Sequence, residues 1–200
     1  MRVDPRRPTN YLAFGQPVLA AADGVVVALR NDIRDSPWAG TGWIDITTPD
    51  LRGNYVVIKH HEHVYTLYAH LQRGSIKVTL GETVHAGQPI GACGHSGHSS
   101  EPHLHFQLQD QADFFTAIGL PITFRRVRRS DSNSTVCLAQ GFIQRDQMVE
   151  PAPADCPAQL IESVVVVKPT LRELLGGIIT FGLILLGVFA IVARIIDTVI

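Results

Sequence analysis

Cysteine is scarce in this sequence, and neither sign of charge is in excess. Three cysteines stand at positions 93, 137 and 156, and no two of them form a C-x-x-C pair. This spacing argues against an all-cysteine zinc site and against a thiol redox motif. The 17 lysines and arginines nearly balance the 18 acidic residues, so the formal net charge is -1. A chain with so little net charge does not attract nucleic acid, and we expect no DNA or RNA partner.

The sequence also lacks an apolar stretch near its start. Residues 1–15 contain nothing of the length that a secretory signal requires. The one long apolar run is Leu174–Ala193, which carries no charge and would span about 30 Å as a helix, the thickness of a bilayer's hydrocarbon core. We therefore expect residues 169–200 to form a transmembrane helix that anchors the protein. The basic residues on either side of the run are too evenly balanced to predict its orientation.

Two of the cysteines are candidates for a disulfide if the domain lies outside the cytoplasm. A bond between Cys137 and Cys156 would stabilise the fold by about 3 kcal/mol in the chain-entropy model, and Cys93 would remain free. The sequence is equally compatible with three small, partly buried hydrophobic thiols.

Short runs rich in β-branched and aromatic residues, broken by glycine, dominate the chain from Gln16 to Asp110. With almost no helical periodicity, this pattern predicts a mainly β fold, an antiparallel β-sandwich or open barrel. Two similar tetrapeptides, Gly15–Val18 and Gly87–Ile90, each lead into an expected strand. The expected strands lie within residues 17–29, 42–48, 54–61, 63–70, 75–80 and 103–109.

The composition divides the chain into three parts. Residues 1–110 are expected to form the β domain, residues 111–168 a β extension with a Pro-rich linker, and residues 169–200 the membrane helix. Within the extension, a basic run favours a solvated strand or turn, with contact to anionic lipid headgroups or wall polymers as the alternative. The run comprises Arg125, Arg126, Arg128 and Arg129.

All nine histidines fall in one part of the β domain, at positions 60, 61, 63, 70, 85, 95, 98, 103 and 105. In the run HLHFQLQ, strand alternation places His103 and His105 on the polar face and Phe106 on the face toward the core. Two imidazoles about 7 Å apart are close enough for one to bind a metal while the other reaches its bound water. Taken alone, the pattern also fits an ordinary surface strand.

The remaining histidines are less distinctive by themselves. His70 ends a run in which alternation places it on the same face as Tyr68, and without context it reads as a half-exposed strand end. His95 and His98, in a Gly/Ser loop, are expected to be exposed, although they could line a cleft. Solvent-facing positions in a hairpin are expected for three others, His60, His61 and His63.

The order of several motifs carries a resemblance that single residues do not. The segments DGVVV, GNYVVIKH, YTLYAH, GETVHAGQPIG and GHSGHSSEPHLHFQL follow one another between Leu12 and Asp110. In this order they resemble the lysostaphin-like zinc endopeptidases, which share the duplicated-hybrid-motif β fold. The resemblance implies that His105 is a zinc ligand and that His103 and His70 flank the metal as general base and transition-state stabilisers.

The resemblance also implies a reaction and a place in the cell. Zinc would acidify a bound water and polarise a peptide carbonyl while the histidines move protons. The substrate would be a peptide bond in bacterial peptidoglycan. We accordingly expect a location in the bacterial cell envelope, with the catalytic domain outside the cytoplasm.

This sequence departs from the family pattern in its metal ligands. Catalytic zinc takes three protein ligands, and the family's other two are a histidine and an aspartate four positions later, upstream of the G-x-P-V strand. The sequence has no histidine before His60, and Asp4 without such a histidine is a poor candidate. We therefore expect the chain to be truncated at its N-terminus.

Two other functional classes remain open at this point. A non-catalytic family member would bind wall peptide or activate another wall hydrolase, and the missing ligands favour it. A lipoyl- or biotin-type carrier, or a sugar phosphotransferase domain, also uses paired G-x-x-V turns. The carrier would need a lysine at a hairpin tip, which the candidate loops do not offer, whereas a phosphotransferase would use His103 or His105.

Overall fold

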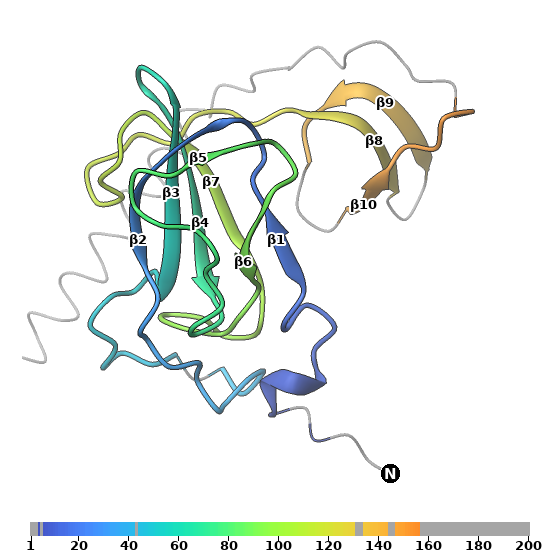
Figure 1. Cartoon of the computed structure of the whole chain (residues 1–200). Helices are drawn as coiled ribbons and strands as arrows, with labels where there is room; N and C mark the ends of the chain where they lie inside the picture. The colour runs from blue at the N-terminus through green and yellow to red at the C-terminus, as the bar shows by residue number, and fades with distance from the viewer. Residues whose placement is uncertain (1–3, 5, 43, 131–133, 144–146, 157–200) are drawn as a thin grey trace, which may run out of the picture. The chain divides into compact units, whose positions relative to one another are not determined.

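The β-branched and aromatic runs of the first 124 residues form an antiparallel sheet, as the sequence predicts (Figure 1). A computed structural model describes residue 4 and residues 6–42, 44–130, 134–143 and 147–156. The sheet has the strand order β5-β2-β3-β4-β7, and a 3-10 turn, Pro8–Asn10, lies near the start of the chain. Its strands are β2 (Gly24–Arg30), β3 (Asn54–His61), β4 (Val64–Leu71), β5 (Thr83–Val84) and β7 (His105–Gln109).

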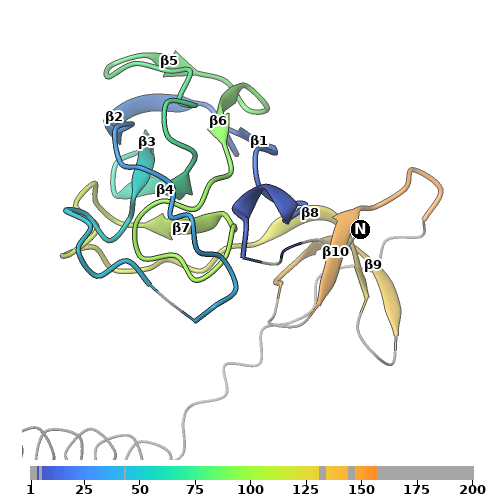
Figure 2. The same ribbon diagram turned by 90° about the horizontal axis from the view of Figure 1, so that it is seen from below.

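The two similar tetrapeptides of the sequence lead into strands that pair with each other. β1 (Pro17–Leu19) and β6 (Pro89–Ala92) form a two-stranded antiparallel sheet, seen beside the larger sheet in Figure 1 and Figure 2. Gly15 and Gly87 precede them with φ values of +79° and +82°, a backbone conformation that favours glycine. The two similar tetrapeptides therefore form two equivalent turns.

The main hydrophobic core lies between these two sheets. Tyr68 and Ile58 of the larger sheet, both almost fully buried, belong to the same cluster as Val18 of β1 and Ile90 of β6. Tyr68 also contacts Phe106 at 5.2 Å between ring centroids, and its hydroxyl oxygen accepts a hydrogen bond from the Ala21 amide at 2.8 Å. Burial of these side chains is the principal stabilising contribution of the unit.

The opposite face of the five-stranded sheet is covered as well. Val57, Leu67 and Ala69 form a second buried cluster, with Ala112 and Phe114 from beyond β7 packed against it. Because both faces are covered, Gln109 has no exposed surface although it lies on the face that alternation makes polar. The amide of Gln109 donates to the Gln111 carbonyl at 2.7 Å, which satisfies part of its hydrogen-bonding need.

Two of the expected strands are not formed. Residues 75–80 contain no regular strand, and among the described residues of 42–48 there is none either. In the second segment the side chain of Asp45 accepts hydrogen bonds from the Thr47 amide at 3.0 Å and the Thr47 hydroxyl at 2.7 Å. This local turn competes with strand pairing, so the apolar alternation of the segment does not produce a strand.

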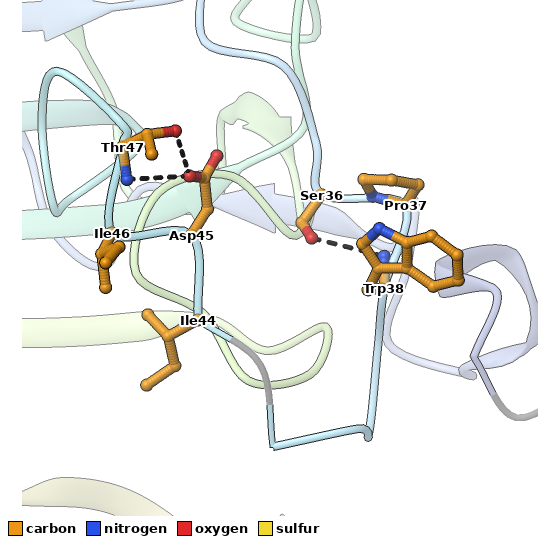
Figure 3. A pocket seen from close by; sticks show the side chains of 7 residues that line it. All are labelled: Ser36, Pro37, Trp38, Ile44, Asp45, Ile46 and Thr47. Atoms are coloured by element: carbon orange, nitrogen blue, oxygen red, sulfur yellow. Dashed lines mark hydrogen bonds between the residues drawn. The ribbon is translucent and has the colours of Figure 1, made fainter.

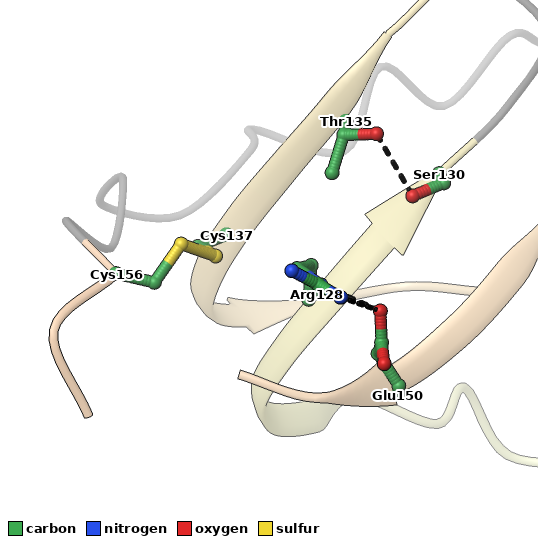
Figure 4. The surroundings of a disulfide bond; sticks show 6 residues. All are labelled: Arg128, Ser130, Thr135, Cys137, Glu150 and Cys156. Atoms are coloured by element: carbon green, nitrogen blue, oxygen red, sulfur yellow. Dashed lines mark hydrogen bonds and ion pairs between the residues drawn. A yellow bond between two sulfur atoms is a disulfide. The ribbon is translucent and has the colours of Figure 1, made fainter. Parts of the chain in front are cut away.

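The chain divides into two compact units, and the second begins at Arg125. A three-stranded antiparallel sheet of order β10-β8-β9 comprises β8 (Phe124–Ser130), β9 (Thr135–Gly141) and β10 (Met148–Pro151). Of the basic run, Arg125 and Arg126 are exposed, and Arg128 forms an ion pair with Glu150 (Figure 4). The run therefore lies in a strand, which is one of the two backbone forms that the sequence favours.

A disulfide joins Cys137 to Cys156 in this unit, with the two Cα atoms 6.2 Å apart (Figure 4). This decides between the alternatives that the sequence left open. Cys93 is a free, buried cysteine in the first unit, as expected.

The expected membrane helix, residues 169–200, lies outside the described residues, as does much of the linker before it. Within the described part of the chain, no helix is long and apolar enough to cross a membrane.

Replacing Ile90, whose side chain has no exposed surface, tests the position of the main core. We expect Ile90→Ala to lower the free energy of unfolding by about 2–5 kcal/mol, because it removes buried methyl groups and leaves a cavity. The measurement is urea unfolding followed by circular dichroism. Leu80→Ala is the matched control, since Leu80 is 68% exposed, and should change stability by no more than about 0.5 kcal/mol. If both variants lowered the free energy of unfolding equally, the placement of Ile90 in the core would be wrong.

Alkylation tests the pairing of the cysteines. In denaturant without reductant, iodoacetamide should label Cys93 alone, because the other two thiols are bonded to each other. After reduction all three should be labelled, and peptide mass spectrometry distinguishes the sites. In the folded chain Cys93 should react slowly, since it is only 4% exposed. Label on Cys137 or Cys156 without reductant would rule out the bond.

Candidate functional site

β7 begins at His105, and His103 lies in the extended segment just before it. His105 is paired with Ala69 of β4 in the antiparallel register, so its side chain lies next to the end of that strand. Phe106 points into the main core, as alternation predicts. The H-x-H pattern is therefore only partly a strand pattern, because the first histidine is held by the preceding loop.

His70 lies on the opposite side of its strand from the one that alternation predicts. Its φ is +59°, a left-handed conformation, which interrupts the alternation near the end of β4. Leu71 consequently joins Tyr68 in the main core, and His70 lines a hollow together with Ala69 and His105. The expectation that His70 shares the face of Tyr68 is wrong, and the reason is this single backbone rotation.

Three imidazoles meet at this point of the sheet. The ring centroid of His70 lies 4.8 Å from that of His103 and 5.9 Å from that of His105. The hollow beside them has a volume of about 160 Å³. Its walls are formed by Leu51, Arg52, Leu67, Ala69, His70, His98, His105 and Phe114.

Burial keeps His70 uncharged. Its side chain is only 6% exposed, so the alternative of a half-exposed strand end is wrong. Desolvation lowers the pKa of His70 to about 4; a hydrogen bond to the Ser96 carbonyl opposes the shift, and the neighbouring histidines add to it. Nδ1 lies 2.8 Å from that carbonyl oxygen, which can only accept. The proton of the neutral ring is therefore on Nδ1, and Nε2 carries the lone pair.

His103 has the same tautomer for the same reason. Its Nδ1 lies 2.7 Å from the Glu101 carbonyl oxygen and 3.3 Å from the Ser99 hydroxyl. Because the carbonyl cannot donate, Nδ1 of His103 must donate to it. In the neutral ring Nε2 is again the nitrogen with a lone pair, which is the form that a general base requires.

A close backbone contact holds the loop that follows β6. Gly97 packs against Gly53, and a Cβ on Gly97 would lie 2.3 Å from the Gly53 amide nitrogen. The His98 amide donates to the Leu51 carbonyl at 2.8 Å within the same contact. The small residues of the loop thus allow it to pack closely against the segment that precedes β3. This contact places the Ser96 carbonyl next to the His70 ring.

The other histidines differ in how well the sequence predicts them. His98 is exposed and lines the hollow, whereas His95 has no exposed surface and is wrongly expected to face solvent. His61 and His63 are exposed, as expected. His60 is half-buried, with its ring nitrogens 2.6 Å from the Asp23 carbonyl oxygen and 2.8 Å from the Thr66 hydroxyl. Local sequence gives no signal for the burial of His95, since its partners are distant in the chain.

Arg52 is a residue of the hollow that the sequence does not single out. Asp50 accepts two hydrogen bonds from its guanidinium, at 2.9 Å and 2.7 Å, and both side chains are largely buried. The guanidinium also lies 3.9 Å from the centroid of the Tyr55 ring. The pair therefore places a positive group at the wall of the hollow with much of its charge balanced by Asp50.

The described residues do not by themselves assemble a metal site. Nε2 of His105, the zinc ligand that the sequence predicts, lies 3.2 Å from the amide oxygen of Gln107. Asp4 is paired with Arg6, whose guanidinium Nε lies 3.0 Å from its carboxylate. Among the described ranges, no three histidine, cysteine, aspartate or glutamate side chains are placed to hold an ion. A three-ligand zinc site does not fit these residues alone.

A larger hollow, about 300 Å³ in volume, lies in the loop of residues 36–47 (Figure 3). No histidine lines it, and its walls are largely apolar. The amide of Trp38 donates to the Ser36 hydroxyl at 3.3 Å, and the indole is 55% exposed. The Ser36 amide donates to the His95 carbonyl at 2.9 Å, which ties this loop to the loop before β7.

Comparison with known sequences now gives this geometry a context. The model of peptidase family M23 matches residues 10–116, more than half of the chain. The peptidoglycan DD-endopeptidase ShyA of Vibrio cholerae is 39% identical over 108 residues, which are 54% of this chain and 21% of that protein. The glycyl-glycine endopeptidase ALE-1 of Staphylococcus capitis is 31% identical over 126 residues, 62% of this chain and 30% of that protein. The chain thus spans less than a third of the length of these relatives.

Solved structures with a partial likeness to this chain include two that are named as peptidases. A zinc-containing peptidase from Vibrio cholerae is 33% identical, with a TM-score of 0.36 over 48% of this chain and 24% of that chain. The catalytic domain of lysostaphin from Staphylococcus simulans is 28% identical, with a TM-score of 0.38 over 55% of this chain and 70% of that chain.

The burial of His70 predicts its titration. In the metal-free chain, the side-chain NMR signals of His70 should titrate near pH 4 rather than near 6.5. Because the pKa is lower in the folded state, the unfolded state binds more protons between these values. The stability contributed by neutral His70 is therefore complete above pH 6.5 and is lost as the pH falls through 4.

The variant His70→Gln both assigns the signal and serves as the control for stability. It should reduce the loss of stability between pH 6.5 and 4, as measured by urea unfolding at each pH. A His70 signal that titrates near 6.5 would show that the ring is not desolvated.

Proposed function

We propose that this chain, which belongs to peptidase family M23, hydrolyses peptide bonds of bacterial peptidoglycan. The observation that carries the proposal is that the ring of His70 lies within 6 Å of the rings of both His103 and His105, as their centroid distances of 4.8 and 5.9 Å show, with the proton of the neutral His70 and His103 rings on Nδ1. Relatives named as peptidoglycan endopeptidases support the substrate class.

Proton transfer is the part of the reaction that the described residues supply. His103 is the general base: its Nε2 accepts a proton from the attacking water, while Nδ1–H remains bonded to the Glu101 carbonyl. The proton then goes to the leaving amine. His70, held by the Ser96 carbonyl, presents Nε2 beside the same ring and orients the water or the peptide carbonyl through a second hydrogen bond.

Dependence on zinc is a further part of the proposal. His105 is the ligand that this chain contributes, and a histidine and an aspartate upstream of Met1 in a longer form of the protein would complete the set of three. Relatives named as metalloproteases support a metal-dependent reaction.

We also propose that the protein acts in the bacterial cell envelope, with its catalytic domain outside the cytoplasm and residues 169–200 as a membrane anchor. The apolar run Leu174–Ala193 supports the anchor. The disulfide between Cys137 and Cys156 supports an oxidising compartment, because such bonds are rare in the cytosol.

Zinc stoichiometry and hydrolysis of purified peptidoglycan test the function and the ligand set together. The chain extended upstream to include a His-x-x-x-Asp sequence should bind one zinc ion and release wall peptides, whereas the 200-residue chain should bind less zinc and be slower. His103→Ala in the active form should lower kcat about 10²–10⁴-fold, because the general base is lost. Mass spectrometry of the released fragments measures the reaction.

His61→Ala is the matched control for these variants, since His61 is an exposed histidine of β3. It should leave hydrolysis and zinc content unchanged. No gain from the upstream extension would contradict the proposed ligand set. Binding of wall peptide without hydrolysis by either form would favour a non-catalytic role.

A further inference from the structure

The imidazole of His95 is buried and hydrogen-bonded at both ring nitrogens. Nε2 lies 3.0 Å from the Trp38 carbonyl oxygen, and Nδ1 lies 2.9 Å from the Ser99 hydroxyl. The ring has no exposed surface. Two bonds of this kind fix both the position and the rotation of a histidine ring. His95 therefore connects the loop around Trp38 to Ser99, which contacts the proposed base.

The direction of each bond follows from what the partners are able to do. The Trp38 carbonyl can only accept, so Nε2 of His95 carries a hydrogen. In the neutral ring Nδ1 is then an acceptor, and the hydroxyl of Ser99 is the donor that faces it. A charged ring without exposed surface would need a carboxylate partner to offset its desolvation. Neither ring nitrogen has one, because their partners are a carbonyl and a hydroxyl.

The hydroxyl of Ser99 has one hydrogen and two possible acceptors. The Glu101 carbonyl oxygen lies 2.7 Å from it and Nδ1 of His95 lies 2.9 Å from it. Glu101 already receives the Nδ1–H of His103 at 2.7 Å, whereas Nδ1 of neutral His95 depends on Ser99. With its hydrogen donated to His95, the Ser99 oxygen presents a lone pair toward Nδ1–H of His103, 3.3 Å away.

We propose that His95 is a positioning residue that orients the base His103 through Ser99. By accepting the serine hydrogen, His95 turns a lone pair of the Ser99 oxygen toward Nδ1–H of His103, so that this oxygen is a second acceptor beside the Glu101 carbonyl. The Ser99 oxygen and the Glu101 carbonyl then stabilise the ring after it gains a proton. This inference rests on the proposed function, in which His103 is the base.

A purely structural role would be to anchor the loop around Trp38. That loop already has backbone anchors that do not involve the ring of His95. The Ser36 amide donates to the His95 carbonyl at 2.9 Å, and the Gly40 amide donates to the Ser100 carbonyl at 2.9 Å. The bond from Nε2 to the Trp38 carbonyl adds to these contacts, whereas the bond between Nδ1 and Ser99 leads to His103, beside the bond that His103 makes to the Glu101 carbonyl.

Two substitutions of His95 separate the roles, because each side-chain amide replaces one ring nitrogen. His95→Asn retains an acceptor where Nδ1 was and so keeps the link to Ser99, but loses the bond to Trp38. His95→Gln retains a donor where Nε2 was, and loses the link to Ser99. We expect His95→Gln to lower kcat about tenfold with KM unchanged, and His95→Asn to recover most of that loss.

Ser99→Ala should match His95→Gln, because it removes the same link with the loss of one oxygen atom. The exposed His61 provides the control pair, His61→Gln and His61→Asn, for which no change is expected. If His95→Asn lowers kcat more than His95→Gln does, His95 is a loop anchor and the proposal is wrong. The same conclusion follows if both variants raise KM and leave kcat unchanged.

NMR of the full chain with ¹⁵N-labelled histidine gives a readout that does not depend on activity. In the unmodified protein, the ring nitrogens should show hydrogen on Nε2 of His95 and on Nδ1 of His103. His95→Gln and Ser99→Ala should lower the population of the Nδ1–H tautomer of His103, and His95→Asn should retain it. An unchanged tautomer in all three variants would overturn the proposal. Absence of hydrolysis by the unmodified enzyme would instead refute the proposed function, and the NMR result would still decide the role of His95.

Discussion

Asn54 and Ser96 make the buried hydrogen bonds on which the geometry of the site depends. Asn54 has no exposed surface; its amide oxygen accepts from the Ile33 amide at 2.8 Å, and its amide group donates to the carbonyls of Ile33 and Leu71 at 2.7 and 3.0 Å. The Ser96 hydroxyl accepts a hydrogen bond from the backbone amide of Asn54 and donates one to the Leu71 carbonyl. Leaving such a group without a partner costs about 1–3 kcal/mol, so the network fixes one arrangement of the loop relative to β3 and β4.

The position of His70 follows from this arrangement. A left-handed conformation costs a residue with a side chain roughly 1–2 kcal/mol, and two backbone bonds offset it here. The His70 amide donates to the Arg52 carbonyl at 2.8 Å, and the His70 carbonyl accepts from the Gly94 amide at 3.0 Å. Ser96 then supplies the carbonyl that holds the ring. The same rotation that breaks the strand alternation therefore brings the imidazole into the hollow beside His105.

Because the position of His70 depends on hydrogen bonds to residues distant in the sequence, some features could be predicted from the sequence and others could not. Strand alternation and glycine turns predict most of the large sheet, because they reflect local propensity and burial, and the ordered motifs indicate the histidines of the site. The side on which His70 lies could not be predicted, since its φ depends on partners elsewhere in the fold. The burial of His95 is not predictable from the local sequence for the same reason, because its hydrogen-bond partner Trp38 is 57 residues away in the sequence. Residues 42–48 alternate like a strand, but the hydrogen bond that the Thr47 amide donates to the Asp45 side chain spans two residues and forms a turn instead.

His70 and His103 are oriented by main-chain carbonyls rather than by carboxylates. The walls of the hollow include no aspartate or glutamate, and the Nδ1 atoms of His70 and His103 donate to Ser96 and Glu101 carbonyls. A carboxylate partner would raise the pKa of an imidazole, whereas a carbonyl fixes the tautomer and leaves the ring neutral after burial. In the neutral form of either ring, the lone pair on Nε2 is the one that could accept a proton. Because both carbonyls belong to residues 96–101, the orientation of the His70 and His103 rings is set within one short loop.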